Sequence, residues 1–401
     1  GEQAITENIV HMVLARIKGA PAGVRGISLF IVPKFRVDEQ GALGERNGVG
    51  LAGLIHKLGY RGTTSTALSF GDDGPCHGYL VGEPHQGLKY MFQMMNEARL
   101  GVGFGAAVIG YRGYLHSLAY ARDRLQGRKP SEKDPESPQV PIIEHADVRR
   151  MLLAQKAYCE GGLALCLYGA RLVDDQHTHP DPDRRREAGK LLDLLTPIMK
   201  AWPSEYGPKA NDLAIQVCGG AGYTREYPVE QCWRDNRLNP IHEGTNGIQA
   251  LDLLGRKVWQ DQGHGLQLLL QAMQRDLEAA SSERCQPWAL SLSETLQQAV
   301  RVTQSLGQAL MSGNPDRPLA NAACYLHLFG HIAVAWMWLR QANAAVAGLD
   351  TATDDGERHF YLGKLQAAQY FFHWELPTVA QDLVLLRNQD DTCLTMRPEW
   401  F

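Results

Sequence analysis

The spacing of apolar residues divides the chain into a strand-rich beginning and a long helical remainder. Residues 9–17, 26–32 and 64–70 are short runs rich in β-branched side chains, separated by glycine, proline, asparagine and aspartate, which is the pattern of strands and turns. From Gly87 onward the apolar residues recur at helical spacing. We therefore expect an α+β, mostly α protein in which a partial antiparallel β-domain precedes a set of helices.

The helical remainder is predicted to be an up-down four-helix bundle followed by a C-terminal helical appendage. The first bundle helix starts at Gly87, and the others cover 144–174, 186–217 and 247–277. The third should stop at Gly219-Gly220, because glycine suits a helix C-terminus. The appendage helices are expected over 293–311, 319–347 and 356–386. The predicted domains are 1–86, 87–278 and 279–401.

Composition excludes some classes of function. The net charge of −4 gives no basic footprint for nucleic acid and no polybasic segment for a membrane surface. The eight cysteines form no Cys-x-x-Cys motif, and their scatter through predicted helices indicates reduced, buried thiols in a cytoplasmic protein. The longest apolar stretch, 320–339, is interrupted by an asparagine and two histidines, so we expect no membrane span. His177 and His179 offer only two ligands in a polar loop, so we expect no metal site.

One segment, residues 241–249 (Ile-His-Glu-Gly-Thr-Asn-Gly-Ile-Gln), places a single carboxylate before a Gly-Thr turn and a helical pattern. A carboxylate on a tight loop at a helix start is oriented by the backbone and partly removed from water, which favours a general base. An isolated glutamate there would more often be an ordinary carboxylate that the dipole at the helix N-terminus stabilises, without a catalytic role. The Gly-Thr pair after Glu243 and the glycine-rich stretch at 216–223 favour the base.

These motifs form an ordered set that resembles the C-terminal helical domain of the flavin-dependent acyl-CoA dehydrogenases. The set consists of Gln216-x-x-Gly-Gly-x-Gly-Tyr, Glu226-Tyr-Pro-Val-Glu, Arg234-Asp and 241–249. Residues 57–65 (KLGYRGTTS) resemble a strand of the family's β-domain. The segments "AWMWL" and "YFFHWELP" resemble the extra C-terminal domain of larger bacterial members, a subgroup that includes 3-methylmercaptopropionyl-CoA dehydrogenases. Relatives have an N-terminal helical domain and further strands ahead of residue 1, and this chain is expected to lack them.

The resemblance implies FAD-dependent α,β-dehydrogenation of an acyl-CoA thioester, as in fatty-acid β-oxidation. Glu243 would remove the α-proton, the flavin would accept a hydride, and an electron-transferring flavoprotein would take the electrons. The resemblance implies that the FAD is held by Arg124, His145, Gln216, Gly219, Gly220, Thr245 and Gly247. It implies that the acyl-CoA is held by Asn96, Arg99 and Gly244. Because relatives share flavin contacts between subunits, a homodimer or homotetramer is expected.

The sequence departs from the family pattern at a few positions. Gly127 stands where short-type members have an aromatic residue three positions after the arginine at 124, and His242 replaces the usual tyrosine before the base. A separate segment, 101–106, formally matches the dinucleotide fingerprint G-x-G-x-x-A, but its surroundings look helical and no βαβ unit follows. We expect these small residues to permit a close helix–helix approach instead.

Three other functions remain open at this point. An acyl-CoA oxidase would share the fold but pass its electrons to oxygen, and peroxide production would reveal it. A relative of this fold is a DNA-associated alkylation-response protein, which the net charge of −4 disfavours here. The chain could also be an inactive, truncated or oligomerising fragment of the same fold, which an absorbance spectrum for bound flavin would test.

Overall fold

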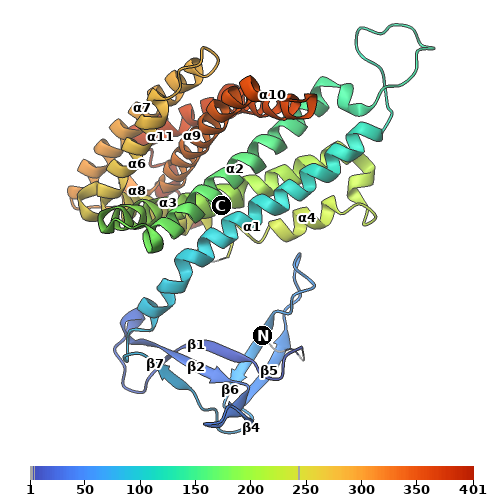
Figure 1. The fold of residues 1–401 in the computed structure, drawn as a ribbon. Helices are drawn as coiled ribbons and strands as arrows, with labels where there is room; N and C mark the ends of the chain where they lie inside the picture. Colours follow the sequence, from blue (N-terminus) through green and yellow to red (C-terminus); the bar gives the residue numbers. More distant parts are fainter. Residues whose placement is uncertain (1–2, 4, 243) are drawn as a thin grey trace. The chain divides into compact units, whose positions relative to one another are not determined.

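The computed structural model describes residue 3 and residues 5–242 and 244–401, except for the side chains of Gln93, Met94 and Asn96. The chain falls into two compact units, Gly1–Ala98 and Arg99–Phe401. Figure 1 shows that the strands belong to the first unit and the long helices to the second. The predicted class, mostly α with a partial antiparallel β-domain, is confirmed.

The described strands form three small antiparallel sheets. In the largest, β1 (Val10–Arg16) pairs along its whole length with β2 (Ile27–Pro33), and β7 (Tyr79–Val81) pairs with the other edge of β2. The remaining pairs are β3 (Phe35–Val37) with β4 (Leu43–Arg46) and β5 (Val49–Leu54) with β6 (Thr66–Phe70). The predicted strands at 9–17, 26–32 and 64–70 are confirmed as β1, β2 and β6. The strands that were not predicted are short or, in β5, contain glycine, so their pattern is weak.

Three long helices build the bundle. They are α1 (Gly87–Asp123), α2 (Ala146–Thr178) and α3 (Pro182–Cys218), and all three were predicted. The predicted stop of the third helix is also confirmed. Gly219 has φ of +59° and its N–H donates to the Gln216 carbonyl, which closes the last turn of α3.

The small residues of 101–106 do permit a close helix–helix approach. A Cβ atom on Gly103 would lie 2.0 Å from the carbonyl oxygen of Met199, so the backbones of α1 and α3 touch at this position. Seven residues, or about two turns, further along α1, a Cβ atom on Gly110 would lie 3.2 Å from the Cα atom of Gly207. The rejection of the dinucleotide fingerprint in favour of packing is therefore confirmed.

The prediction of one helix over 247–277 is wrong. The chain instead forms α5 (Asn246–Gly255), a 3-10 turn (Lys257–Trp259) and α6 (Gln260–Glu278), and it adds an unpredicted helix, α4 (Val229–Asn236). Residues 261–263 have positive φ values of 49°, 57° and 79°, which break the helical path. Two contacts stabilise this break. The Trp259 indole N–H donates to the Leu254 carbonyl, and Lys190 pairs with Asp261 at 2.8 Å.

The appendage contains two corrections to the predicted helices. Helix α7 begins at Gln286 rather than 293, because Pro287 is tolerated in the first turn of a helix. The predicted helix 356–386 is interrupted by a π-helical turn (Phe371–Glu375) and a 3-10 turn that contains Pro377. The appendage elements are α7 (Gln286–Met311), α8 (Asp316–Leu319), α9 (Ala322–Thr351), α10 (Asp355–Tyr370), α11 (Val379–Asn388), α12 (Thr392–Thr395) and a 3-10 turn (Pro398–Trp400).

Helix α9 is the centre of the core that the bundle and the appendage share. Trp336 and Trp338 are almost fully buried, and the Trp338 indole donates to the Ala157 carbonyl of α2 at 3.1 Å. By length and composition α9 could cross a membrane, contrary to our expectation from its polar residues. However, 83% of its apolar window is buried within the fold. The apolar surface of α9 is therefore used in packing.

The cysteines partly follow the expectation. All eight are free thiols, and Cys159, Cys166, Cys218 and Cys285 are among those that are buried. Cys393 is exposed, so the expectation of buried thiols is wrong for that residue. Burial raises the pKa of the Cys166 thiol to about 12, so this thiol stays protonated.

His331 on α9 makes the stability of the fold sensitive to acid. It is fully buried, and its Nδ1 donates to the His327 carbonyl at 3.0 Å. Burial, with the neighbouring His327, lowers the pKa of His331 from 6.5 to about 3. Between pH 6.5 and about pH 3, His331 therefore binds a proton in the unfolded chain but not in the folded chain. The stability contribution is complete above pH 6.5 and is lost as pH falls from 6.5 towards 3.

We expect His331→Leu to reduce this acid sensitivity. Between pH 6 and pH 4 the free energy of unfolding of the wild type should fall by up to about 1.4 kcal/mol per pH unit more than that of the variant. Urea unfolding at several pH values measures the difference. Parallel pH dependence in the two proteins would show that His331 is not held neutral.

Candidate active site

The loop before α5 is shaped by three local features. Gly244 has φ of +82°, a conformation that side chains disfavour, and a Cβ atom there would lie 2.5 Å from Nε2 of Gln249. That Gln249 amide donates to the Gly244 carbonyl at 3.3 Å, and Thr245 Oγ1 accepts from the Ile248 N–H at 3.4 Å as the N-cap of α5. The loop is thus tied to the first turn of α5. Glu243, the predicted base, lies outside the described residues.

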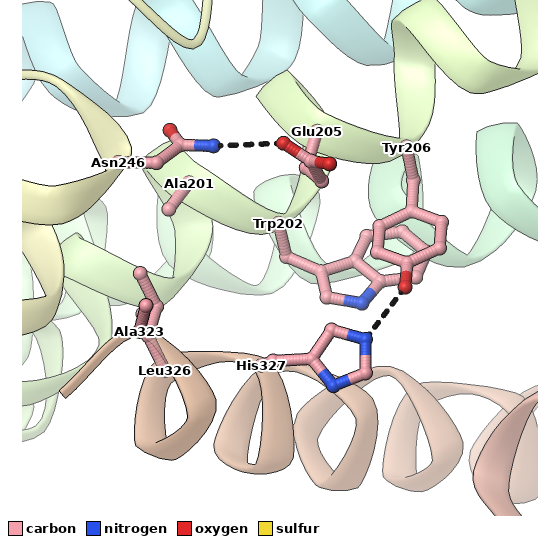
Figure 2. Close-up of a pocket in the computed structure, with 8 residues that line it drawn as sticks. All are labelled: Ala201, Trp202, Glu205, Tyr206, Asn246, Ala323, Leu326 and His327. Atoms are coloured by element: carbon pink, nitrogen blue, oxygen red, sulfur yellow. Dashed lines mark hydrogen bonds between the residues drawn. The ribbon is translucent and has the colours of Figure 1, made fainter. Parts of the chain in front are cut away.

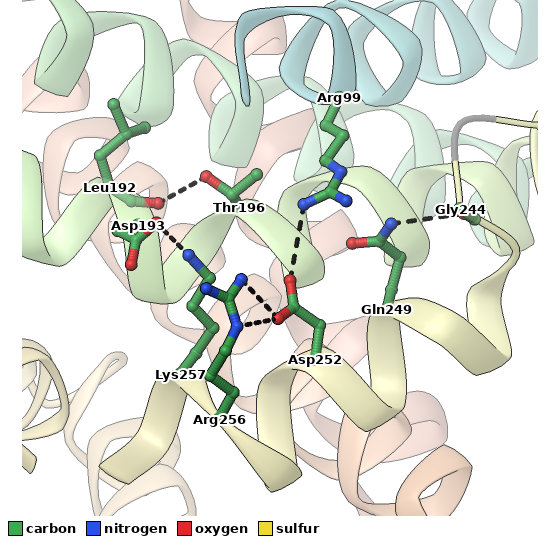
Figure 3. A network of polar contacts seen from close by, with 9 residues as sticks. All are labelled: Arg99, Leu192, Asp193, Thr196, Gly244, Gln249, Asp252, Arg256 and Lys257. Atoms are coloured by element: carbon green, nitrogen blue, oxygen red, sulfur yellow. Dashed lines mark hydrogen bonds and ion pairs between the residues drawn. The ribbon is translucent and has the colours of Figure 1, made fainter. Parts of the chain in front are cut away.

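Arg99 lies beside this loop in a network of polar contacts (Figure 3). It is 8% exposed, and Nη1 lies 3.5 Å from Oδ2 of Asp252 on α5. Asp252 also accepts from Arg256 at 2.7 Å, so one carboxylate holds two guanidinium groups. The ion pair fastens α1 to α5 just below the loop. The side chain of Asn96, the other predicted acyl-CoA contact on α1, lies outside the described residues.

The other predicted cofactor residues gather at the far end of α1. Arg124 is exposed directly after α1, and Gln216, Gly219 and Gly220 are exposed at the end of α3. One apolar cluster joins Ala121, Ile142, Met151 and Val217, so the end of α1, the start of α2 and the end of α3 meet there. A Cβ atom on Gly219 or Gly220 would meet nothing within 4 Å. This surface leaves the glycine backbones open to a ligand.

His145 fills the space that Gly127 leaves. Its ring lies 3.4 Å from the position of a Cβ atom on Gly127, and its Nε2 donates to the Gln126 carbonyl at 2.8 Å. Gly127 has φ of +68°, which glycine adopts without strain. The imidazole therefore stands against the position where short-type relatives have an aromatic residue.

The predicted site residues thus fall into two groups, one around Arg99 in the first half of α1 and one just after the last residue of α1. Arg99 and Arg124 are 25 residues apart in the sequence. At 1.5 Å per helical residue this separation is about 37 Å. Gly244, Thr245 and Gly247 belong to the Arg99 end, and His145, Gln216, Gly219 and Gly220 to the Arg124 end. The loop lies closer to the second group than Arg99 does, because Asn246 donates to Glu205, which precedes Gln216 on α3 by 11 residues or about 17 Å.

A cavity behind the loop was not predicted from the sequence. This cavity of about 250 Å³ lies between α3, α5 and α9 (Figure 2). Asn246, the first residue of α5, donates to the Glu205 carboxylate at 3.2 Å, and Glu205 pairs with Lys209 at 3.2 Å. The lining residues are Ala201, Trp202, Glu205, Tyr206, Asn246, Ala323, Leu326 and His327. Residues scattered over three helices carry no joint sequence motif.

A chain of hydrogen bonds on the wall of this cavity fastens the appendage to α3. His327 lies between Asp382, 2.6 Å from its Nδ1, and the Tyr206 hydroxyl, 2.8 Å from its Nε2. An aspartate carboxylate only accepts, so Nδ1 of His327 carries a proton and donates to Asp382. Burial, followed by the charge of Glu375, raises the pKa of Tyr206, which keeps the hydroxyl protonated as a donor. Among the described residues, no group of three or more His, Cys, Asp or Glu could hold a metal ion.

Comparison with known proteins gives the class to which this fold and these motifs belong. Residues 85–258 match the family described as "Acyl-CoA dehydrogenase, C-terminal domain". Residues 269–397 match the family described as "Acetyl-CoA dehydrogenase C-terminal like". The chain belongs to the acyl-CoA dehydrogenase family.

Individual relatives cover nearly the whole chain. The 3-methylmercaptopropionyl-CoA dehydrogenase of Ruegeria pomeroyi is 37% identical over 98% of this chain. The broad-specificity linear acyl-CoA dehydrogenase of Mycobacterium tuberculosis is 35% identical over 97% of it. The chain spans 66% of the length of each of these two relatives.

Solved structures share the fold. The Caenorhabditis elegans ACDH-11 complex with C11-CoA has a TM-score of 0.74 at 20% sequence identity. The match includes 98% of this chain and 58% of the ACDH-11 chain. The Bacillus anthracis acyl-CoA dehydrogenase complexed with FAD has a TM-score of 0.71 at 21% sequence identity. The match includes 96% of this chain and 62% of the other chain. At these identities the likeness establishes the fold alone.

Proposed function

We propose that this chain carries the helical part of an FAD-dependent acyl-CoA dehydrogenase, in which Glu243 is the general base. The Glu243 carboxylate takes the α-proton of an acyl-CoA thioester. The electron pair of that C–H bond becomes the new Cα=Cβ bond, and hydrogen leaves Cβ as a hydride. FAD, when bound, supplies the acceptor for the hydride. The proposal is supported by the family, by the ordered motifs and by the relatives' names.

The observation that carries the proposal is the construction of the loop around Glu243. Directly after Glu243 the backbone turns at Gly244, and Thr245 and Gln249 fasten that turn to α5. A carboxylate must be ionised to accept a proton, and the N-terminus of a helix favours a negative charge nearby. The contacts of Thr245 and Gln249 also attach the backbone that follows Glu243 to α5, and attachment of a catalytic group to a helix favours proton transfer in one geometry.

The open surface at the far end of α1 fits the diphosphate and adenine of FAD. The exposed guanidinium of Arg124 supplies a charge for phosphate, and Gly219 and Gly220 let a ligand approach the backbone. We propose that His145 and Gln216 complete this contact. At the start of α5, Thr245 and Gly247 would lie near the flavin ring.

The homo-oligomer remains a proposal that follows from the family. Each FAD would take contacts from two copies of the chain, which makes a homodimer the smallest complete unit, or a homotetramer built from such dimers. The electron acceptor that we propose is an electron-transferring flavoprotein, and the free thiols support a cytoplasmic location.

Asn96 and Arg99 remain proposed contacts for the acyl-CoA, with Gly244 at the thioester. Since Asp252 occupies one N–H side of Arg99, only the remaining N–H groups of the guanidinium could meet the substrate. Arg99 would then both seat the substrate and hold α1 against α5.

The direct test is to load the purified protein with FAD, remove unbound cofactor and add saturated acyl-CoA without oxygen. We expect retained visible flavin absorbance, its bleaching by acyl-CoA and formation of one 2-enoyl-CoA per flavin. Re-oxidation by an electron-transferring flavoprotein, with little peroxide under air, would support a dehydrogenase, whereas rapid peroxide formation would identify an oxidase. Protein that binds FAD and is not bleached by acyl-CoA of any chain length would overturn the proposal.

A further inference from the structure

Three buried asparagines connect the helices of the bundle to the residue that precedes Glu243. Asn211 on α3 and Asn236 on α4 are fully buried, and Asn239 in the following turn is 3% exposed. Asn211 donates to the Ile109 carbonyl of α1 at 3.0 Å. Asn236 donates to Oδ1 of Asn211 at 2.7 Å, and Asn239 donates to Oδ1 of Asn236 at 2.7 Å.

We call Asn211, Asn236 and Asn239 the asparagine ladder. The backbone of α1 determines which side-chain amide donates and which accepts at each step of this ladder. The carbonyls of Ile109 and Ala106 can only accept, so Asn211 and Asn236 must each present their NH₂ group to them. Asn236 then uses one N–H on Ala106, at 3.0 Å, and the other on Asn211. Its oxygen is left for Asn239, which must therefore donate. None of the three side-chain amides can be turned around without placing two acceptors together.

Two glycines make room for the ladder. A Cβ atom on Gly113 of α1 would lie 2.3 Å from Nδ2 of Asn211. A Cβ atom on Gly207 of α3 would lie 2.8 Å from Nδ2 of Asn236. A larger residue at either position would force the amides away from the carbonyls of α1. The space for these buried amides is therefore part of the helix packing.

The ladder ends at the loop of the proposed base. Because Nδ2 of Asn239 is spent on Asn236, its Oδ1 faces Nε2 of His242 at 3.3 Å, and that nitrogen must carry the proton. The backbone of the same turn is held by Lys200, which is fully buried and donates to the Asn239 carbonyl at 2.7 Å. The turn before Glu243 is thus fixed by its backbone and by its side chains.

We propose that Asn211, Asn236 and Asn239 form a one-directional relay that fixes the protonated nitrogen of His242, and that His242 is a positioning residue for Glu243. The proposal rests on the proposed function in taking Glu243 as the base. Here each amide has one allowed orientation, and the series leads from α1 to the residue adjacent to Glu243.

The test observes the ring of His242 directly. The chain is labelled with ¹⁵N-histidine, and His242 is assigned by the signals that disappear in His242→Gln. We expect a protonated Nε2 with a one-bond N–H correlation at neutral pH. Asn239→Ala should make that proton exchange with water about tenfold faster, the factor that one hydrogen bond supplies. Asn239→Asp keeps an acceptor for Nε2 of His242 and should retain the signal, but it loses the donor to Asn236 and should lower the free energy of unfolding. Asn388→Asp, on the exposed end of α11, is the matched control.

Three results would overturn the proposal: a proton on Nδ1 alone, an N–H signal that Asn239→Ala does not change, or loss of the signal in the control. If Asn239→Ala does not fold, the wild-type spectrum and Asn239→Asp still decide the question. In FAD-loaded protein Asn239→Ala should lower kcat more than it changes KM, and more than Asn239→Asp does. A wild type without desaturase activity would refute the proposed function while leaving the NMR result intact.

Discussion

Glu243→Gln is expected to lower the rate of acyl-CoA desaturation by about 10²- to 10⁴-fold, the usual contribution of a positioned general base. The amide has nearly the same shape as the carboxylate but cannot take a proton. The substituted residue lies in a loop that Gly244, Thr245 and Gln249 shape through contacts of their own. Binding of FAD should therefore be unchanged. Rapid-mixing measurement of flavin bleaching by saturating acyl-CoA gives the rate.

Glu294→Gln is the matched control for this prediction. Glu294 is an exposed carboxylate on α7 in the appendage, so the same chemical change is made far from the loop in sequence. The control should bleach at the wild-type rate. A Glu243→Gln protein that bleaches as fast as the control would remove Glu243 from the mechanism, and loss of FAD from it would show a structural role instead.

Gly103→Ala is expected to destabilise the helical unit by about 3 kcal/mol, because it overpacks a site with no freedom to adjust. The new methyl group would lie 2.0 Å from the Met199 carbonyl oxygen, and the obstacle is backbone rather than a movable side chain. Helices α1 and α3 would have to separate, which would disturb contacts along both. Urea denaturation monitored by circular dichroism measures the change in the free energy of unfolding.

The same motif offers two controls. A Cβ atom on Gly101 or Gly105 would meet nothing within 4 Å, although both residues lie in the same turns of α1 as Gly103. Since alanine favours a helix over glycine by about 0.5–1 kcal/mol, Gly101→Ala and Gly105→Ala should be neutral or slightly stabilising. Equal destabilisation by all three substitutions would contradict the close contact between α1 and α3.

Long periodic segments were predictable from the sequence, and breaks within them were not. Helices α1, α2 and α3 follow from apolar spacing and from the glycine at 219. The segment 247–277 contains Gly255, Gly263 and Gly265, a local signal of a break that the apolar spacing on either side of it outweighed in the prediction. The ion pair of the turn at 261–263 was not predictable, because Lys190 is 71 residues before Asp261 in the sequence and reaches it only in the folded chain. The π-helical turn at Phe371–Glu375 lies just before Pro377, a proline inside the predicted helix 356–386.

The candidate site was predictable where it consists of contiguous motifs. The loop at 241–249 and the glycines at 219 and 220 are local signals, and the structure shows the turn and the open backbone that they imply. The partners of these motifs come from distant positions. Asn211 and Asn236 are 25 residues apart, and Glu205 meets Asn246 across 41 residues, so neither pairing could be inferred from a single sequence. The role of His242 became accessible only with its neighbours in place.

The central claim is that Glu243 removes a proton from the carbon next to the thioester carbonyl. It is tested most directly with an acyl-CoA in which sulfur replaces the β-carbon, so that no hydride can leave and only proton removal remains. In heavy water, FAD-loaded wild-type protein should exchange the α-protons of this compound for deuterium, detected by mass spectrometry, and Glu243→Gln should not. Equal exchange by the two proteins, or none by the wild type, would contradict the account.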